Sequence, residues 1–415
     1  MTKLPTPARG WIPWIALGAF AFAQRARLDE DPKPALWQLL ESSAEAKGFR
    51  ADFDAVPAHL AAMVAVSKAP LGGLALTRVS RALSQPWTVP AIALELRDGL
   101  AAPVEPKGAA ELVPVIDAVT RWLDLEPAPA AADAVPNPDF DALWRRICAP
   151  EVVEQALLEM LSEYLAACHG ALDRLTPALG YDELVLLREG FPDWCEAFFR
   201  THDPKAELTP TESALSERYR TLCSKVDRAR LLATTRAVVR LAEPAFLATL
   251  AKRIARTPRS KGKVDGFSGD VVAVAGDGVE CRVVLLGPGK TTITGFAALV
   301  IDLGGDDTWK RAAVVEGPEA LAQVVIDLNG DDSYESAGFG PAYAVGGVAL
   351  LVDVRGKDRY ESQRLGQAAS SLGSAVLLDL EGDDSYSAED FAQGYSFGGV
   401  GLLLDRAGDD SYEAW

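Results

Sequence analysis

The feature that most constrains this chain is an internal repeat in its last third. Five copies of the pattern D-x-x-G-x-D-x-aromatic follow one another, written VIDLGGDDTW, VIDLNGDDSY, LVDVRGKDRY, LLDLEGDDSY and LLDRAGDDSY. Their spacing is 25 residues once and 26 residues three times, because the first aspartates are Asp302, Asp327, Asp353, Asp379 and Asp405. Five copies in one register exclude a chance match and predict one structural unit per copy.

A period of 26 residues rich in Gly and Val suits one coil of a parallel β-solenoid better than a pair of helices. We expect three short strands per coil: the apolar triplet with its Asp, the segment around the aromatic residue, and a Gly-flanked stretch ending near Gly347, Gly373 or Gly399. The G-D-D turn forms a corner, where Gly accepts backbone angles closed to other residues and Asp side chains bind local N–H groups. A degenerate earlier copy ending at Ile293 places the start of the array near Gly269.

The chain before the repeat has the pattern of helices. Apolar residues at three- and four-residue spacing predict a helical region over 24–125 and a helical domain over 139–256, separated by a Pro/Ala linker at 126–138. A basic linker, 257–268, leads to the solenoid domain at 269–415. The predicted fold class is therefore a multidomain α+β protein, with an all-α N-terminal region followed by a short right-handed parallel β-helix. A meander of antiparallel hairpins is the alternative fold for the repeat.

Two helix starts carry capping signals. Asn137 followed by Pro138 predicts the start of the helix FDALWRRI, with the proline in its first turn. Thr209 and Glu212 have the spacing of a capping box, which predicts a second start at Pro210.

Residues 1–23 have the features of a secretory signal peptide. Two basic residues precede an apolar stretch from Trp11 to Ala23, which ends in Ala-Phe-Ala. This predicts a periplasmic, cell-envelope or secreted protein; a buried first helix in a cytoplasmic protein is the alternative. The cysteines fit two disulfides in an oxidising compartment or reduced thiols in the cytoplasm, and those in helical sequence are Cys148, Cys168, Cys195 and Cys223.

Negative charge is concentrated in the repeat. Residues 264–415 hold 26 Asp and Glu against nine Lys and Arg, a net charge of −17 out of −18 for the chain, which excludes a general nucleic-acid binder. Equivalent carboxylates on coils about 4.8 Å apart repel by about 0.9 kcal/mol in water and roughly 3.5 kcal/mol at an effective dielectric of 20. Backbone donors, a cation or interleaved bases must offset this repulsion. Lys357 is such a base, because it occupies the column of Asp306, Asp331, Asp383 and Asp409.

The Asp turns have three interpretations. The side chains bind only backbone amides, they hold structural Ca²⁺, a hard ion that takes six to eight oxygen ligands, or one copy carries catalytic carboxylates. The last is the weakest, since a residue repeated for geometry rarely carries chemistry at one copy, and we assign no catalytic or cofactor-binding residues. The candidate metal ligands are Asp302, Asp306, Asp307, Asp327, Asp331, Asp332, Asp379, Asp383, Asp384, Asp405, Asp409 and Asp410.

The strings LGGDDTW and LNGDDSYE are similar to the glycine-aspartate turns of calcium-binding RTX repeats. The whole array, about 130 residues, resembles bacterial repeat proteins with G-D-D-x-Y units and no assigned role. The resemblance implies Ca²⁺ at the acidic turn residues. The chain departs from RTX repeats in its period of 26 instead of nine, in having one turn motif per coil, and at Lys357.

Two strings look like enzyme motifs. GYSFG matches the G-x-S-x-G of a nucleophile elbow, but Ser396 occupies the repeat column of Ala344 and Ser370, and no histidine follows it in the sequence. GPGKTT lacks the first glycine of a phosphate-binding loop, because position 284 is Val284. Both strings are therefore interpreted as parts of the repeat.

We expect a non-catalytic protein that is exported or located in the cell envelope. Its acidic solenoid, stabilised by Ca²⁺, would bind or scaffold a protein or glycan ligand. A polysaccharide-active β-helix lyase or hydrolase is one alternative. A self-assembling structural protein is another, because the last coil would expose strand edges that Trp415 or a second copy would have to cover, giving an end-to-end homo-oligomer.

Overall fold

The structure is a computed structural model of the whole chain. It describes residues 112–122, 138–149, 154–175, 182–183, 185–186, 190–191, 193–194, 209–255, 257, 263–316, 320–336 and 338–414. The predicted signal peptide, the helical region up to residue 111, most of the Pro/Ala linker, Cys195 and Trp415 lie outside these residues. All described elements belong to one compact unit that spans residues 103–415.

The region before the repeat is helical, as predicted. Its described helices are α6 (Leu112–Trp122), α7 (Phe140–Ile147), α8 (Glu154–Leu172), α11 (Pro210–Cys223), α12 (Arg228–Val238), the 3-10 helix η3 (Val239–Ala242) and α13 (Pro244–Ile254). Among the described residues, we find no helix that combines the length and the hydropathy needed to cross a membrane.

One of the two capping predictions is confirmed. The Thr209 hydroxyl accepts the N–H of Glu212 at 3.2 Å, and the Glu212 carboxylate accepts the N–H of Thr209 at 2.8 Å, which forms the capping box at the start of α11. The N-cap expected at Asn137 is wrong. Helix α7 is capped by Asp139, whose carboxylate accepts the N–H of Ala142 at 2.9 Å, so Pro138 precedes the cap instead of entering the first turn.

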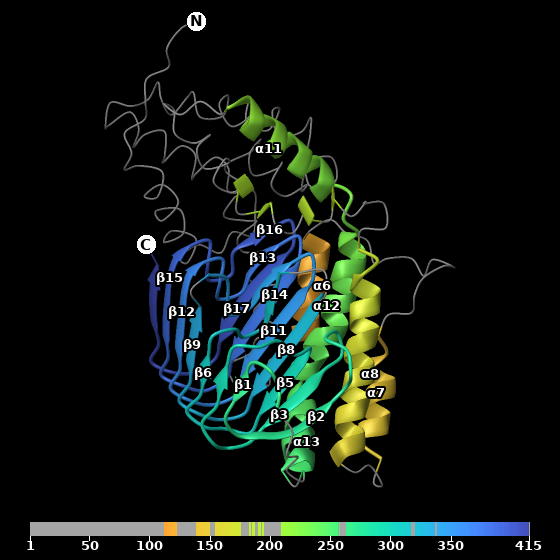
Figure 1. Cartoon of the computed structure of the whole chain (residues 1–415), viewed down its shortest axis with the longest axis vertical. Helices are drawn as coiled ribbons and strands as arrows, with labels where there is room; N and C mark the ends of the chain where they lie inside the picture. Colours follow the sequence, from red (N-terminus) through yellow and green to blue (C-terminus); the bar gives the residue numbers. More distant parts are fainter. Residues whose placement is uncertain are drawn as a thin grey trace, which may run out of the picture. The chain divides into compact units, whose positions relative to one another are not determined.

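The repeat forms a β-solenoid of about four turns with roughly 26 residues per turn, as predicted. Its coils contribute strands to three sheets (Figure 1). Sheet A consists of β1 (Phe267–Ser268), β4 (Thr292–Ile293), β6 (Thr308–Trp309), β9 (Ser333–Ser336), β12 (Arg359–Arg364), β15 (Ser385–Asp390) and β18 (Ser411–Ala414). Sheet B consists of β2 (Val271–Ala275), β3 (Val283–Leu286), β5 (Leu299–Asp302), β8 (Ala322–Asp327), β11 (Val348–Asp353), β14 (Ser374–Asp379) and β17 (Val400–Asp405). Sheet C consists of β7 (Val314–Val315), β10 (Tyr343–Val345), β13 (Ala369–Ser371) and β16 (Ser396–Phe397).

The strands of successive coils pair in parallel and in the register of the repeat. Asp327 lies beside Asp353, and Asp353 beside Asp379. Ile293 lies beside Trp309, so the degenerate copy is a true coil. The parallel pairing excludes the antiparallel meander for the repeat. Antiparallel pairing occurs only at the start of the stack among the described strands, where β2 lies against β3 and β1 against β4.

The interior of the solenoid is an apolar core with a column of stacked aromatic rings. Tyr334, Tyr360 and Tyr386 are almost completely buried, and the ring centroids of adjacent copies lie 4.7 Å apart with nearly parallel planes. Trp309 continues the stack with its ring centroid 5.8 Å from that of Tyr334. The aromatic column therefore faces inward and fixes the vertical alignment of the coils.

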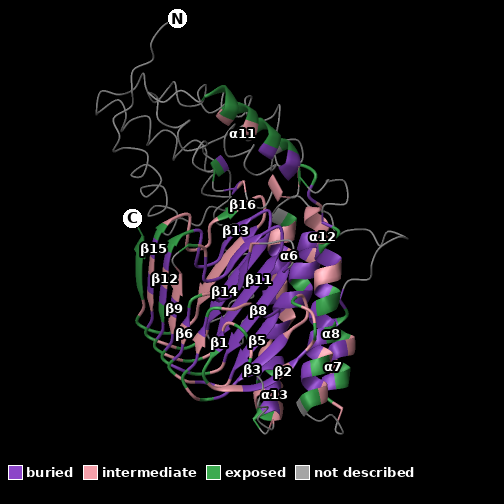
Figure 2. Cartoon of the chain, in the orientation of Figure 1, coloured by how far each residue is buried: buried purple, intermediate pink, exposed green. Residues whose placement is uncertain are grey.

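Sheet B is buried on both faces because helices α8 and α12 pack against its outer face. The Thr235 hydroxyl of α12 donates to the Ser374 hydroxyl of β14 at 2.7 Å. Burial on both faces explains why segments such as LLVDV and VLLDL are continuously apolar instead of alternating. Figure 2 shows this difference, with buried residues along β8, β11 and β14 and exposed residues along the strands of sheet A.

The described cysteines are free thiols: Cys148 is exposed, Cys168 and Cys223 are buried, and Cys281 is half-buried. Because Cys148, Cys168 and Cys223 are unpaired, the described part of the chain contains no disulfide among the helical cysteines.

The glycine column of the G-D-D corner is required mainly by close approach between coils. A Cβ at Gly356 would lie 1.8 Å from the carbonyl oxygen of Gly330, and a Cβ at Gly382 would lie 2.4 Å from that of Gly356. Gly330 also has a φ of +158°, whereas no positive φ is recorded at Gly356 or Gly382. The corner is thus tight because the coils stack on each other's backbone.

We expect Gly356→Ala to lower the free energy of unfolding by about 2–4 kcal/mol, because neither backbone can move without breaking the ladder of strands. Thermal unfolding followed by circular dichroism measures the change. Gly338→Ala is the matched control, since an added Cβ there meets no atom within 4 Å. Equal melting temperatures for Gly356→Ala and the wild type would contradict the close stacking.

Candidate metal centre

Each G-D-D corner carries two buried carboxyl groups and one exposed position. The first Asp of the repeat, at Asp302, Asp327, Asp353 and Asp379, has no exposed surface, and the third, at Asp307, Asp332, Asp358 and Asp384, is 2–3% exposed. We call these two columns the inner carboxyl columns. In the last coil, Asp405 and Asp410 are half-buried.

The third Asp of each turn is held by the backbone of the preceding coil. The Asp332 N–H donates to Asp358 Oδ1 at 2.7 Å, and the Asp358 N–H donates to Asp384 Oδ1 at 2.7 Å. The same bond joins Asp307 to Asp332 at 2.6 Å and Asp384 to Asp410 at 2.9 Å. Every coil junction therefore contains a charge-assisted hydrogen bond that offsets part of the repulsion expected between stacked carboxylates.

The first Asp of each turn receives tyrosine hydroxyls from the aromatic column. Tyr334 donates to Asp353 Oδ2 at 2.6 Å and also lies 3.2 Å from Asp327 Oδ2. Tyr360 donates to Asp379 Oδ2 at 2.7 Å. The aromatic position was predicted to stack, but its role as a donor to the first Asp was not. The signal was present in the sequence, because the aromatic residue always follows that Asp by seven positions.

The second position of each turn points outward and forms a separate column. Asp306, Asp331, Asp383 and Asp409 are exposed, together with Lys357. The Lys357 N–H donates to Asp331 Oδ1, and the Asp409 N–H donates to Asp383 Oδ1, both at 2.9 Å. These four candidate ligands do not join the buried clusters, since the groups of acidic side chains found among the described residues contain only first and third aspartates.

The inner columns bring three carboxyl groups together at three levels of the stack. The groups are Asp327, Asp332 and Asp353; Asp358, Asp379 and Asp384; and Asp384, Asp405 and Asp410, and within each the candidate ligand oxygens lie within 4.8 Å of one another. Asp353 and Asp358, which are not among the predicted metal ligands, also belong to these groups. Asp302 and Asp307 do not.

Several oxygens in these clusters have no hydrogen-bond donor. They are Oδ2 of Asp332, Asp358 and Asp384, and Oδ1 of Asp353 and Asp379. A buried carboxylate oxygen without a donor is costly, so each cluster needs a shared proton or a cation. Each cluster offers one oxygen from each of three carboxylates, of the hard type that Ca²⁺ prefers, so the residues fit part of the six to eight ligands of that ion.

Burial raises the pKa of the carboxyl groups at Asp327, Asp332, Asp353, Asp358, Asp379 and Asp384. It raises the pKa of Asp332 and Asp384 to about 6, that of Asp379 to about 7 and that of Asp358 to about 8. Burial also raises the pKa values of Asp327 and Asp353, and the neighbouring carboxylates add to the effect. Without a cation, the corner therefore holds protons at pH values where ordinary carboxyl groups are ionised.

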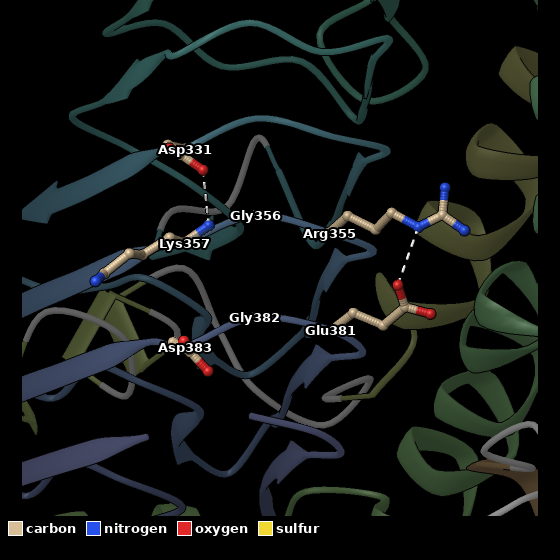
Figure 3. A pocket seen from close by; sticks show the side chains of 7 residues that line it. All are labelled: Asp331, Arg355, Gly356, Lys357, Glu381, Gly382 and Asp383. Atoms are coloured by element: carbon tan, nitrogen blue, oxygen red, sulfur yellow. Dashed lines mark hydrogen bonds and ion pairs between the residues drawn. The ribbon is translucent and has the colours of Figure 1, made fainter. Parts of the chain in front are cut away.

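A shallow groove of about 460 Å³ lies on the outer surface of the same corner. Figure 3 shows Lys357 and Arg355 pointing away from one another on either side of Gly356. Arg355 forms an ion pair with Glu381 at 3.1 Å, and both side chains are more than half exposed. The groove thus presents charges of both signs at the turn that carries Arg355 and Lys357.

The two enzyme-like strings belong to the repeat. Ser396 pairs with Ser370 on adjacent strands, and their hydroxyl oxygens lie 2.9 Å apart. Thr291 of GPGKTT donates its N–H to Asp307 at 2.5 Å, which is the bond made at every later coil.

Comparison with known proteins gives no family for this chain. No protein-family model matches it, and neither curated proteins nor solved structures give a match.

We predict that in the presence of a chelator the solenoid is less stable at pH 8 than at pH 5. An unfolded Asp loses its proton near pH 3.8, whereas the folded inner columns keep protons up to about pH 6–8. The stability that these protonated carboxyl groups contribute is therefore fully present at low pH and is lost as the pH rises through this window. We expect a melting temperature lower by at least about 5 °C at pH 8, measured by differential scanning calorimetry.

Asp358→Asn should reduce this pH dependence, since it removes a titrating group and turns the unpartnered oxygen into an N–H donor facing carboxylates. Asp383→Asn is the matched control on the exposed column. Equal pH dependence in the two variants would contradict the assignment to the inner columns.

Proposed function

We propose that this protein is a non-catalytic binding or scaffolding module whose solenoid is stabilised by Ca²⁺ bound to the inner carboxyl columns. The observation that carries the proposal is the set of buried carboxylate oxygens that lack hydrogen-bond donors at successive coil junctions. Because these groups are buried, they can bind one another, a proton or a small ion, but they are out of reach of a large substrate.

The identity of the inner residues supports a role for charge. If the third Asp served only as an acceptor for a backbone N–H, Asn would supply the same oxygen without repulsion. All ten inner positions are nevertheless Asp, whereas the exposed column admits Lys357 and the position before the glycine admits Asn329. A cation gives a reason for carboxylate at every inner position.

The repetition of the corner supports a non-catalytic role. An active site generally combines different groups at one place, and its nucleophile or general base lies within reach of substrate. The inner carboxyls are equivalent from coil to coil and buried. The outer groove is shallow and charged, which suits contact with a protein or a glycan chain better than enclosure of a small substrate.

We expect Ca²⁺ to raise the melting temperature of the chelator-treated protein at pH 8 by about 5 °C or more, because an ion bound only by the folded state stabilises it in proportion to its occupancy. Calorimetric titration with Ca²⁺ at pH 8 should show binding, and binding should weaken at pH 5, where protons compete for the same oxygens.

Asp358→Asn should reduce both the Ca²⁺-dependent shift and the number of bound ions, whereas the exposed Asp383→Asn should retain both. If Ca²⁺ neither binds nor changes the melting temperature at pH 8, the ion is wrong and the columns are held by protons alone. Loss of binding in Asp383→Asn but not in Asp358→Asn would place the site on the outer surface.

We further propose that the protein is exported, on the basis of residues 1–23, which lie outside the described residues. Millimolar Ca²⁺ outside the cytoplasm would suit a site that competes with protons. The exposed polar surface of sheet A and the groove at Lys357 are the surfaces we propose for a protein or glycan ligand.

N-terminal sequencing of the protein from fractionated cells should give Gln24 as the first residue in the periplasmic, envelope or secreted fraction. A variant with a charged residue in the apolar segment, Leu17→Arg, should remain uncleaved in the cytoplasm. Wild-type protein that keeps Met1 in the cytoplasm would overturn the proposal of export without affecting that of Ca²⁺ binding.

A further inference from the structure

The three carboxyl clusters of the inner columns are not equivalent. The first, formed by Asp327, Asp332 and Asp353, has no member in common with another cluster, and we call it the isolated cluster. The other two clusters share one residue, because Asp384 is a member of both. Together they contain five carboxyl groups from three successive copies of the repeat, which we call the joined clusters: Asp358, Asp379, Asp384, Asp405 and Asp410.

The shared residue is held between its neighbours with one oxygen left over. Oδ1 of Asp384 accepts the N–H of Asp358 at 2.7 Å, and the N–H of Asp384 donates to Oδ1 of Asp410 at 2.9 Å. Oδ2 of Asp384 has no hydrogen-bond donor, although the residue is only 2% exposed. Because a buried carboxylate oxygen without a donor is costly, this atom needs a proton or a cation.

The cluster formed by Asp358, Asp379 and Asp384 contains a further unpartnered oxygen on each of its other two members. The hydroxyl groups of Tyr360 and Tyr386 both donate to Oδ2 of Asp379, at 2.7 and 3.1 Å, and leave its Oδ1 without a donor. Oδ2 of Asp358 also has no donor. The candidate ligand oxygens of the three residues lie within 4.8 Å of one another. This cluster therefore has the geometry of an ion site on unpartnered oxygens, in addition to its negative charge.

We propose that Asp384 is a bridging ligand and that the joined clusters hold two Ca²⁺ ions, whereas the isolated cluster holds one. This inference rests on the proposed function and specifies how many ions the columns bind and which residue they share. Two ions carry four positive charges and leave five ionised carboxylates with a net charge of −1. One ion leaves three ionised carboxylates with the same net charge, so the joined and isolated clusters become electrostatically alike.

A single ion in the joined clusters would not achieve this balance. It would leave the five carboxylates with a net charge of −3, at separations where buried like charges repel strongly. Each ion is bound by three carboxylates when Asp384 serves both, and one of the two ions has only two carboxylates when Asp384 serves the other alone. Since Ca²⁺ takes six to eight oxygen ligands, the shared arrangement is the better coordinated one.

Sharing a ligand links the occupancy of the two ions. Loss of Asp384 removes a carboxylate from both sites, whereas loss of Asp358 or Asp410 removes a carboxylate from one site only. A bridged pair and two independent sites therefore predict different numbers of lost ions for the same substitution.

Calorimetric titration of the full chain with Ca²⁺ at pH 8 should give three bound ions for the wild type, one for each cluster. Asp384→Asn should bind one ion, because Asn keeps an acceptor for the Asp358 N–H but replaces the free oxygen with an N–H donor. Asp358→Asn and Asp410→Asn should each bind two, and so should Asp332→Asn in the isolated cluster. The exposed Asp383→Asn is the control and should bind three.

The melting temperature of Asp384→Asn in chelator should be at least that of the wild type, since the substitution removes one of several repelling carboxylates. This measurement separates the loss of ions from a loss of folding.

A second measurement tests the bridge in the wild-type protein. Mn²⁺ also prefers carboxylate oxygens, and two Mn²⁺ ions on one carboxylate are magnetically coupled. Electron paramagnetic resonance of the wild type loaded with Mn²⁺ should therefore show a coupled pair beside one isolated ion. Asp358→Asn should show isolated ions only.

The outcomes separate this inference from the proposed function. If Asp384→Asn retains two Ca²⁺ ions, if the wild type binds fewer than three, or if Mn²⁺ gives only isolated signals, the bridge is wrong while Ca²⁺ binding itself stands. A wild type that binds no Ca²⁺ at pH 8 overturns both.

Discussion

The structure depends on how it stabilises like charges that lie only one β-strand spacing apart. Parallel stacking of identical coils places each Asp of the corner one strand spacing from its equivalents, and at the inner columns water does not screen them. The corner meets this constraint in three ways. Backbone N–H groups of the preceding coil bind the third Asp, tyrosine hydroxyls bind the first, and the exposed column keeps its charges in solvent and includes Lys357.

These interactions provide hydrogen-bond donors for some of the buried carboxylate oxygens and leave others without a donor. A third-column Asp has one oxygen on a backbone amide and a second oxygen without a donor. A tyrosine hydroxyl has one proton, so Tyr334 cannot donate to Asp327 and Asp353 at the same time. A proton or a cation in each cluster completes the arrangement. The choice between them depends on pH and on the concentration of the ion, because both bind the same oxygens.

The repeat register made the solenoid predictable, since columns such as Gly330, Gly356 and Gly382 could be aligned by spacing alone. The difference between Asp306, which is exposed, and Asp307, which is buried, could not be read in the same way. Both are Asp in the same turn, and their burial follows from the direction in which each residue leaves the corner. The turn that contains Lys357 shows the same limit: Lys357 occupies only the exposed column, whereas Asp353 and Asp358 of that turn lie in the inner columns and were not predicted as ligands.

The packing of the helices on sheet B was also beyond the sequence patterns, because a helical period defines an apolar face but not the surface that it meets. The signal lay in the strands. A solenoid strand with one face in solvent would alternate, as β12 does with Arg359, Tyr360 and Glu361, whereas β11 and β14 are apolar throughout. The chain thus covers one face of the solenoid with its own helices and leaves sheet A polar.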